Sequence, residues 1–224
     1  MTGKGQSMIK EKEKIKGLIL KEQYNELGEL IKEKKSRLSL LLSLSYTTDN
    51  NIRFKVIKAA GYASSAVSEQ GLEFVRTLIS NLLWSLNDDS GSVGWSSPEL
   101  LGEIISARMD LFKEYVPLVI SLLKIKETYF RPGGLWAMGR IAARDPSPIK
   151  PYAPYINMYL ADPVSETRGY AVWCLGQIES PVPEEHRQHL LQDTAEIWLM
   201  DGQGNISKKT IGQITQETVT RKLQ

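Results

Sequence analysis

Apolar residues recur at intervals of three and four along much of the chain, the spacing that gathers them on one face of an α-helix. The series Phe74, Leu78 and Leu82 is an example. The longer stretches with this periodicity are 29–46, 70–86, 111–124, 149–160 and 184–200. No alternating run of Val, Ile and Thr extends beyond a few residues, so the pattern predicts helices and no β-sheet.

Clusters of Asp, Asn, Pro and Gly separate these stretches, and clusters of this kind end helices. They lie at 49–50, 88–91, 145–148, 162–163, 181–183 and 201–202. The predicted helices are therefore short and follow one another closely.

A second pattern lies between the longer stretches and repeats around a glycine. The glycines of its four copies are Gly61, Gly102, Gly139 and Gly176, at spacings of 41, 37 and 37 residues. A degenerate fifth copy contains Gly212, another 36 residues on. Periods of about 40 residues indicate a solenoid, in which each unit buries its apolar face against its neighbours. We therefore predict an all-α fold, a right-handed α–α superhelix of about five antiparallel helix pairs.

The order of Asp, Arg and a small-residue helix ending in Ala/Leu-Gly-x-Ile resembles HEAT and HEAT-like repeats, including those of the phycobilin-lyase type. The best copy is DPVSETRGYAVWCLGQI at 162–178, followed by the copy that begins at Asp49. The resemblance covers roughly residues 29–212. It implies a ladder between adjacent repeats, formed by Arg53, Arg131 and Arg168 with Asp49 and Asp162. In the second copy Gly94 takes the place of the arginine.

Two faces of the second helix of each repeat differ in composition when positions are counted from the glycine. One face carries small or apolar residues and should form the core, so Cys174 is expected to be a buried small hydrophobe. The other face is aromatic and charged, and second helices line the concave side of such arrays. With Arg131 added, the predicted binding groove consists of Trp95, Glu99, Glu103, Arg131, Trp136, Arg140 and Trp173.

Structural roles compete with the binding role at several of these positions. Trp136 and Trp173 can instead pack under neighbouring repeats, since Trp is usually buried. Glu99 can form a capping box with Ser96 at a helix start. The glycines after Arg131 at 133–134 can either expose backbone N–H groups to an anion or allow tight packing of this turn against the loop at 88–94.

Charge narrows the choice of partner. The chain of 224 residues has a net charge of +2, but residues 1–44 carry 10 Lys+Arg and 6 Asp+Glu, so the rest is slightly acidic. A nucleic-acid partner is therefore not expected, because duplex binding needs a basic face. The Lys/Glu-rich residues 1–27 are predicted to be an N-terminal tail or helix, solvated or acting as an arm for an acidic partner. Residues 28–224 are predicted to be one repeat domain.

Compartment follows from simpler features. No apolar run is long enough to cross a bilayer, so no membrane insertion is expected. No apolar stretch follows Met1, and Cys174 is the only cysteine. These features favour the reducing cytoplasm.

Signatures of catalysis and of cofactors are missing from the sequence. His186 and His189 share a helix face, but no plausible ligand set surrounds them, so neither a metal nor a cofactor is predicted. The expected function is a non-enzymatic scaffold that binds a protein or peptide partner through the groove. Two alternatives stay open: a DNA-repair glycosylase of the HEAT-like type, which the Trp95–Glu99 spacing resembles, and a lyase or maturation factor that acts on a cofactor-bearing protein.

Overall fold

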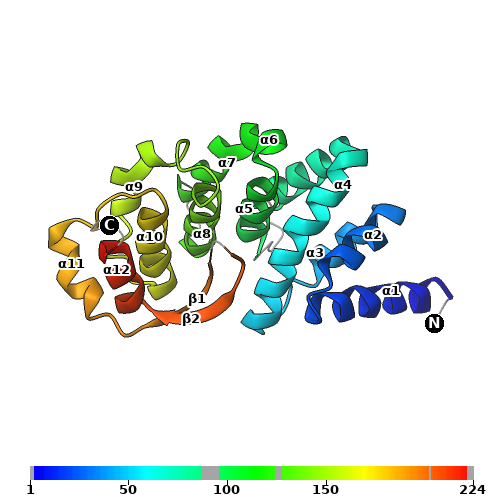
Figure 1. Cartoon of the computed structure of the whole chain (residues 1–224), viewed down its shortest axis with the longest axis horizontal. Helices are drawn as coiled ribbons and strands as arrows, with labels where there is room; N and C mark the ends of the chain where they lie inside the picture. Colours follow the sequence, from blue (N-terminus) through cyan, green and yellow to red (C-terminus); the bar gives the residue numbers. More distant parts are fainter. Residues whose placement is uncertain (1–2, 87–95, 125–127, 202, 221–224) are drawn as a thin grey trace. The chain divides into compact units, whose positions relative to one another are not determined.

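The computed structural model describes residues 3–86, 96–124, 128–201 and 203–220. Its contacts divide the chain into two compact units, Met1–Arg108 and Met109–Gln224. Each unit consists mainly of short helices that pack side by side (Figure 1). The predicted boundary at residue 27 stays a prediction.

The first unit is helical throughout its described part. Its helices are α1 Gly3–Leu20, α2 Tyr24–Glu33, α3 Arg37–Ser43, α4 Asn50–Ser85 and α5 Ser97–Ala107. The Lys/Glu-rich N-terminal segment forms α1, whose Ile15 and Ile19 are buried and lie four residues apart on one face. α4 packs against α2, α3 and α5 and so forms the centre of the unit.

Helix α4 is two helices joined at a kink. Gly71 has non-helical backbone angles (φ −158°, ψ 51°), and the Lys35 ammonium donates a hydrogen bond of 2.9 Å to the carbonyl of Gln70 beside it. A cation at this carbonyl stabilises the end of the first helical half. At the start of α4, the Asp49 side chain accepts a hydrogen bond from the Ile52 backbone N–H. The prediction that Asp49 joins the ladder is therefore wrong, since it caps its own helix.

The second unit adds short helices and one hairpin. Its α-helices are α6 Met109–Phe112, α7 Val116–Ser121, α8 Arg131–Ala142, α9 Ala153–Asn157, α10 Ser165–Gln177, α11 Glu184–Leu191 and α12 Ile211–Thr220. Single 3-10 turns are η1 Lys113–Tyr115, η2 Leu122–Lys124, η3 Thr128–Phe130 and η4 Lys150–Tyr152. α10 packs between α8 and α12 (Figure 1).

The prediction of no β-sheet is wrong for residues 196–210. Strand β1 Glu196–Met200 pairs antiparallel with β2 Ile206–Thr210, with Trp198 opposite Lys208. α11 ends at Leu191, so the expected helix over 184–200 covers only its first half. The Asp193 carboxylate accepts the backbone N–H of Ala195, a local bond that competes with helix continuation. Burial then alternates along β1.

The repeat glycines lie where the predicted second helices approach each other. Gly61, Gly102, Gly139 and Gly176 occupy α4, α5, α8 and α10. A Cβ atom at Gly61 would lie 2.9 Å from Cγ of Glu103, and one at Gly139 would overlap the Trp173 ring. At Gly176 it would lie 2.8 Å from Oγ1 of Thr218. At these three sites, glycine lets the next helix along come close.

The core follows the predicted apolar face. Ala59, Leu101, Ala137 and Leu175, which precede the repeat glycines by one or two residues, are all fully buried. Cys174 is also fully buried, as predicted, and burial raises the pKa of its thiol. Within the described ranges, no helix is both long and apolar enough to cross a bilayer.

Candidate functional site

The repeat arginines form ion pairs with acidic residues of the following repeat. Arg53 Nη1 lies 3.0 Å from Oε1 of Glu99, and Arg131 Nη1 lies 3.5 Å from Oδ2 of Asp162. Arg168 Nη2 lies 2.7 Å from Oδ2 of Asp193. The predicted ladder is confirmed for the three arginines and for Asp162.

Glu99 and Glu103, the predicted groove residues of the first unit, are buried rather than open. They are only 5% and 6% exposed. Glu99 is the ladder partner of Arg53, and the capping-box prediction is wrong because Ser96 makes no cap bond. The Ser96 hydroxyl instead donates to the carbonyl of Ser45. Trp95, like Gly94, lies outside the described residues.

The predicted groove residues of the second unit are also mostly sealed. Trp136 is 0% exposed, Trp173 7% and Arg140 9%. The two indole rings stack with centroids 6.3 Å apart, and the Arg140 guanidinium lies over the Trp136 ring. The expectation that these side chains are accessible is wrong, and the packing alternative describes them. Arg131 is partly exposed beside Asp162 and lies over the Tyr159 ring.

The turn after Arg131 is packed against its surroundings, although its predicted neighbour, the loop at 88–94, lies outside the described residues. Gly133 and Gly134 are both buried in the first turn of α8. A Cβ atom at Gly134 would lie 3.2 Å from Cδ2 of Leu123. The second glycine of this turn therefore admits a neighbouring apolar side chain.

The β1–β2 hairpin covers part of the predicted stripe. The Tyr170 hydroxyl donates to the carbonyl of Trp198 across 2.8 Å, and Arg140 Nη1 donates to the carbonyl of Asp201 across 2.7 Å. Ile197 fits against Gly169, where a Cβ atom would lie 2.5 Å from its Cδ1. A cavity of about 80 Å³ remains beside Trp173. In the second unit, the β1–β2 hairpin therefore covers part of the predicted binding surface.

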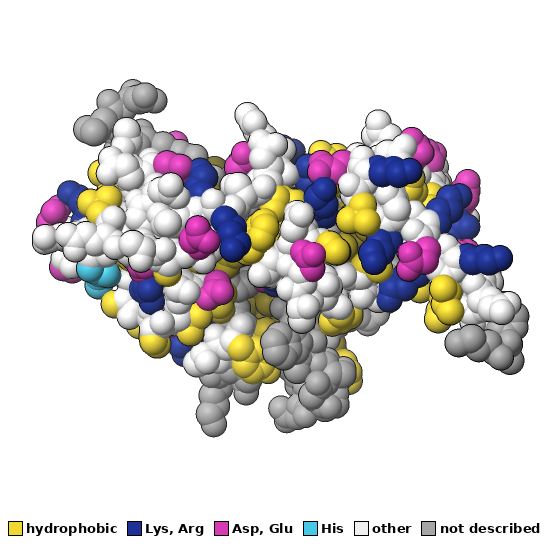
Figure 2. All heavy atoms as spheres, turned by 90° about the horizontal axis from the view of Figure 1, so that it is seen from below, with side chains coloured by type: hydrophobic (Ala, Val, Ile, Leu, Met, Phe, Trp, Pro, Cys, Tyr) yellow, Lys and Arg dark blue, Asp and Glu magenta, His cyan; other side chains and the backbone are white. Residues whose placement is uncertain are grey.

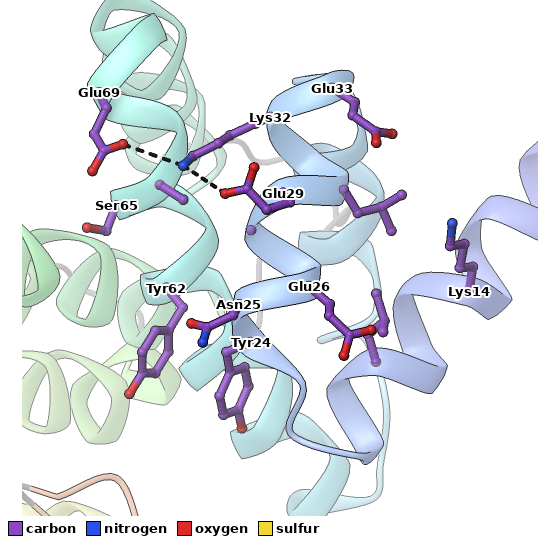
Figure 3. A pocket seen from close by; sticks show the side chains of 14 residues that line it. Lys14, Tyr24, Asn25, Glu26, Glu29, Lys32, Glu33, Tyr62, Ser65 and Glu69 are labelled. Carbon is purple, nitrogen blue, oxygen red and sulfur yellow. Dashed lines mark hydrogen bonds and ion pairs between the residues drawn. The ribbon is translucent and has the colours of Figure 1, made fainter.

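An open groove lies in the first unit, where α1, α2 and α4 meet (Figure 3). Its volume is about 670 Å³. We call it the α2 groove, because most of its lining comes from that helix. It is lined by Lys14, Leu18, Tyr24, Asn25, Glu26, Gly28, Glu29, Leu30, Lys32, Glu33, Tyr62, Ser65, Ala66 and Glu69.

Small residues form the floor of the α2 groove and charged residues form its rim. A Cβ atom at Gly28 would lie 3.4 Å from the Cβ of Ala66, so α2 and α4 pack closely. The Lys32 ammonium lies between two carboxylates, 3.0 Å from Glu29 on α2 and 3.5 Å from Glu69 on α4 (Figure 3). These contacts raise the pKa of Lys32, the hydrogen bond to Glu29 most of all.

An aromatic pair lies at one end of the α2 groove. The rings of Tyr24 and Tyr62 stack in parallel with centroids 4.7 Å apart, and Tyr62 is 51% exposed. Burial raises the pKa of Tyr24, with further contributions from Glu22, Tyr62 and Glu103. The Lys58 ammonium lies 5.1 Å from the centroid of the Tyr24 ring.

The described residues form no group of three or more His, Cys, Asp or Glu side chains that could hold a metal ion. His186 and His189 contact each other edge to face, and His189 lies near the carbonyl of Leu160. On the face that Figure 2 displays, positive and negative side chains are interspersed. The α2 groove thus combines charges of both signs with an aromatic pair, which are features of a recognition surface.

Comparison with protein families identifies one segment of the chain. Residues 128–178 match the family model described as HEAT-like repeat. The chain carries a HEAT-like repeat. The matched segment contains α8 and α10, the Arg131–Asp162 ion pair and the stacked Trp136 and Trp173. In this HEAT-like repeat the arginine and the tryptophans join one helix pair to the next.

Solved structures give the fold of the whole chain. An engineered protein is 18% identical, with a TM-score of 0.50, over 93% of this chain and 88% of its own. A second engineered protein is also 18% identical, with a TM-score of 0.50, over 89% of this chain and 50% of its own. A designed armadillo repeat protein in complex with the peptide (KR)4 is 20% identical, with a TM-score of 0.49, over 93% of this chain and 91% of its own. No curated protein matches the chain. The fold is a mostly helical α-solenoid with HEAT-like repeats, as predicted.

The sequence contains a further copy of the repeat pattern beyond those predicted. Gly28 lies in the sequence Glu-Leu-Gly-Glu-Leu-Ile, 33 residues before Gly61, and it faces the next second helix in the same way. Its neighbour Glu29 corresponds to Tyr62, one position after the glycine. The predicted groove face is therefore also present on α2, and on this helix it lines an open groove.

Proposed function

We propose that the protein is a non-enzymatic scaffold that binds a protein or peptide partner in the α2 groove. Ligand sites are concave and combine apolar surface with a few polar groups, and the α2 groove has both. It has room for several side chains of a partner, with a volume of about 670 Å³. The open groove itself is the observation that carries this proposal.

The predicted stripe of the second unit stays a proposal as a second binding surface. Trp173 lies beside the hairpin, which contacts Gly169, Tyr170 and Arg140, so access to this ring requires the hairpin to move. We also keep the cytoplasm as the proposed compartment, on the ground that Cys174 is an unpaired buried thiol. Nothing in the described site favours the glycosylase or the lyase alternative, since Glu99 is bound to Arg53.

A peptide-display selection tests the scaffold function without assuming a partner. A random peptide library is panned against the wild-type protein and against Ser65→Trp, which places a large ring in the α2 groove. Ser80→Trp is the matched control, because Ser80 is exposed on the same helix and does not line the groove. The expected result is a set of peptides that bind the wild type and Ser80→Trp but lose binding to Ser65→Trp. Selection of no peptide, or of peptides indifferent to Ser65→Trp, would overturn the proposal.

A further inference from the structure

The lining of the α2 groove is acidic although the chain as a whole is not. Its carboxylates are Glu26, Glu29, Glu33 and Glu69, and its amines are Lys14 and Lys32. The lining therefore carries a net formal charge of −2 in a chain whose net charge is +2. A groove of one sign attracts ligands of the other sign, and solvent screens this attraction at high salt.

The carboxylates have capacity for a further cation. The side chains of Glu29, Glu33 and Glu69 are 74%, 69% and 59% exposed. Each of the bonds that they form with Lys32 or Arg37 uses one carboxylate oxygen. An ionised carboxylate offers about four acceptor positions on its two oxygens, so exposed positions remain for donors from a ligand.

The carboxylates lie on both sides of α2. Figure 3 shows Glu29 on the side of α4, close to Glu69, whereas Glu26 and Glu33 point toward the side of α1. A partner segment that lies along the exposed face of α2 would therefore meet carboxylates on both flanks. This arrangement suits an extended chain, because successive side chains of a strand point to opposite sides.

Two lysines of the protein already make the contacts that a cationic ligand would make. The Lys32 ammonium bridges Glu29 and Glu69 across the groove. The Lys58 ammonium lies over the ring of Tyr24, at a distance typical of a cation–π contact. Tyr62 stacks on Tyr24 and remains half exposed, so its ring is available to a planar guanidinium.

We infer that the α2 groove recognises a short extended segment with Arg or Lys side chains on both of its edges, with Arg preferred at the Tyr62 end. This inference rests on the proposed scaffold function and specifies its partner. Phosphate-bearing ligands are the opposite case, since the carboxylates on the rim repel them.

Fluorescence anisotropy with three labelled peptides of equal length tests the charge preference. The probes alternate Ser with Arg, with Gln or with Glu. The Arg–Ser peptide should bind the wild-type protein at least about tenfold more tightly than the Gln–Ser peptide, and the Glu–Ser peptide should bind least. The affinity of the Arg–Ser peptide should fall as the NaCl concentration is raised. Equal binding of the Arg–Ser and Gln–Ser peptides would overturn the inference.

A matched pair of double variants separates the groove from the net charge of the protein. Glu29→Gln with Glu69→Gln should weaken binding of the Arg–Ser peptide by about tenfold. Glu166→Gln with Glu185→Gln removes the same charge from exposed positions of the second unit and should leave the affinity within about twofold. Equal losses in both variants would show long-range attraction only and overturn the inference. Tyr62→Leu should reduce the preference for Arg–Ser over a Lys–Ser peptide.

The display selection distinguishes failure of this inference from failure of the scaffold function. Peptides that are lost with Ser65→Trp but contain no excess of Arg and Lys would leave the scaffold function in place and overturn the cationic preference. Failure of both the selection and the Arg–Ser peptide would overturn both.

Discussion

Arg53 on α4 donates a hydrogen bond of 3.0 Å to the carboxylate of Glu99 on α5 and so joins two successive helices of the first unit. Glu99 is 5% exposed and is bound to Arg53. From the sequence alone, the same position is equally compatible with ligand binding. Ion pairs between an arginine and an acidic residue recur at Arg131 and at Arg168. A charged side chain that recurs with the repeat period is therefore explained first by the contacts between successive repeats.

Arg168→Ala should lower the free energy of unfolding by about 1–3 kcal/mol. Arg168 donates two bonds to Asp193 and others to the carbonyls of Asp162 and Pro163, so its loss leaves several acceptors without a donor. Urea denaturation measures the change. Arg144→Ala is the control, because Arg144 is exposed and its loss should change the free energy of unfolding by at most about 0.5 kcal/mol. Equal effects of the two variants would contradict a structural ladder.

Trp136→Ala should destabilise the protein by about 3–5 kcal/mol, because it removes a fully buried ring and leaves a cavity beside Trp173. Trp84→Ala should change the stability by less than about 0.5 kcal/mol, since Trp84 is 71% exposed. Guanidinium denaturation followed by circular dichroism compares the two variants. A small effect of Trp136→Ala on the free energy of unfolding would instead support the sequence prediction that Trp136 lies in an accessible groove.

The solenoid could be predicted because its determinants are local and periodic. Each repeat glycine follows its arginine by eight residues at Arg53, Arg131 and Arg168, and both residues serve contacts that every repeat needs. Gly28 could not be predicted from this pattern, because its copy has Leu20 in place of the arginine and also lies only 33 residues from the next repeat glycine. The α2 groove was missed for the same reason.

The hairpin and the burial of the stripe could not be predicted from local patterns. Alternation in β1 extends over only five residues, and Ile197 and Met200 also have helical spacing. The accessibility of Arg140 depends on a carbonyl at Asp201, 61 residues later in the chain. The composition of a helix face shows that the face is polar. Which segment of the chain covers that face is determined by tertiary packing.

Gly139→Ala should destabilise the protein by about 1–3 kcal/mol, although alanine is the better helix former. The added methyl group would overlap the ring of Trp173, which is buried and stacked on Trp136. Gly17→Ala is the matched test, because Gly17 lies in α1 and a Cβ atom there meets nothing within 4 Å. That variant should raise the stability by about 0.4–1 kcal/mol. Thermal melts of both variants should therefore shift in opposite directions, and a shared direction would contradict the close approach at Gly139.

Acid should release the turn of the hairpin at a pH below the ordinary pKa of an aspartate. Partial burial raises the pKa of Asp201, but the Asn205 side chain and the backbone N–H groups of Asn205, Gln203 and Gly204 outweigh burial, so the pKa lies below its ordinary value of 3.8. Because the pKa is lowered on folding, the stabilisation is present above pH 3.8 and is lost as the pH falls through the folded-state pKa.

A titration of backbone amide signals by nuclear magnetic resonance measures this transition at the residues concerned. The amides of Gln203 and Asn205 donate to the Asp201 carboxylate at 2.8 and 2.9 Å, so their chemical shifts should report its protonation. We expect their common midpoint below pH 3.8, and we expect Asp201→Asn to abolish the transition at both amides. Asp145→Asn, in a separate turn closed by Ser147, should leave both midpoints unchanged. A midpoint at or above 3.8 would show that the turn bonds do not outweigh burial and would contradict this prediction.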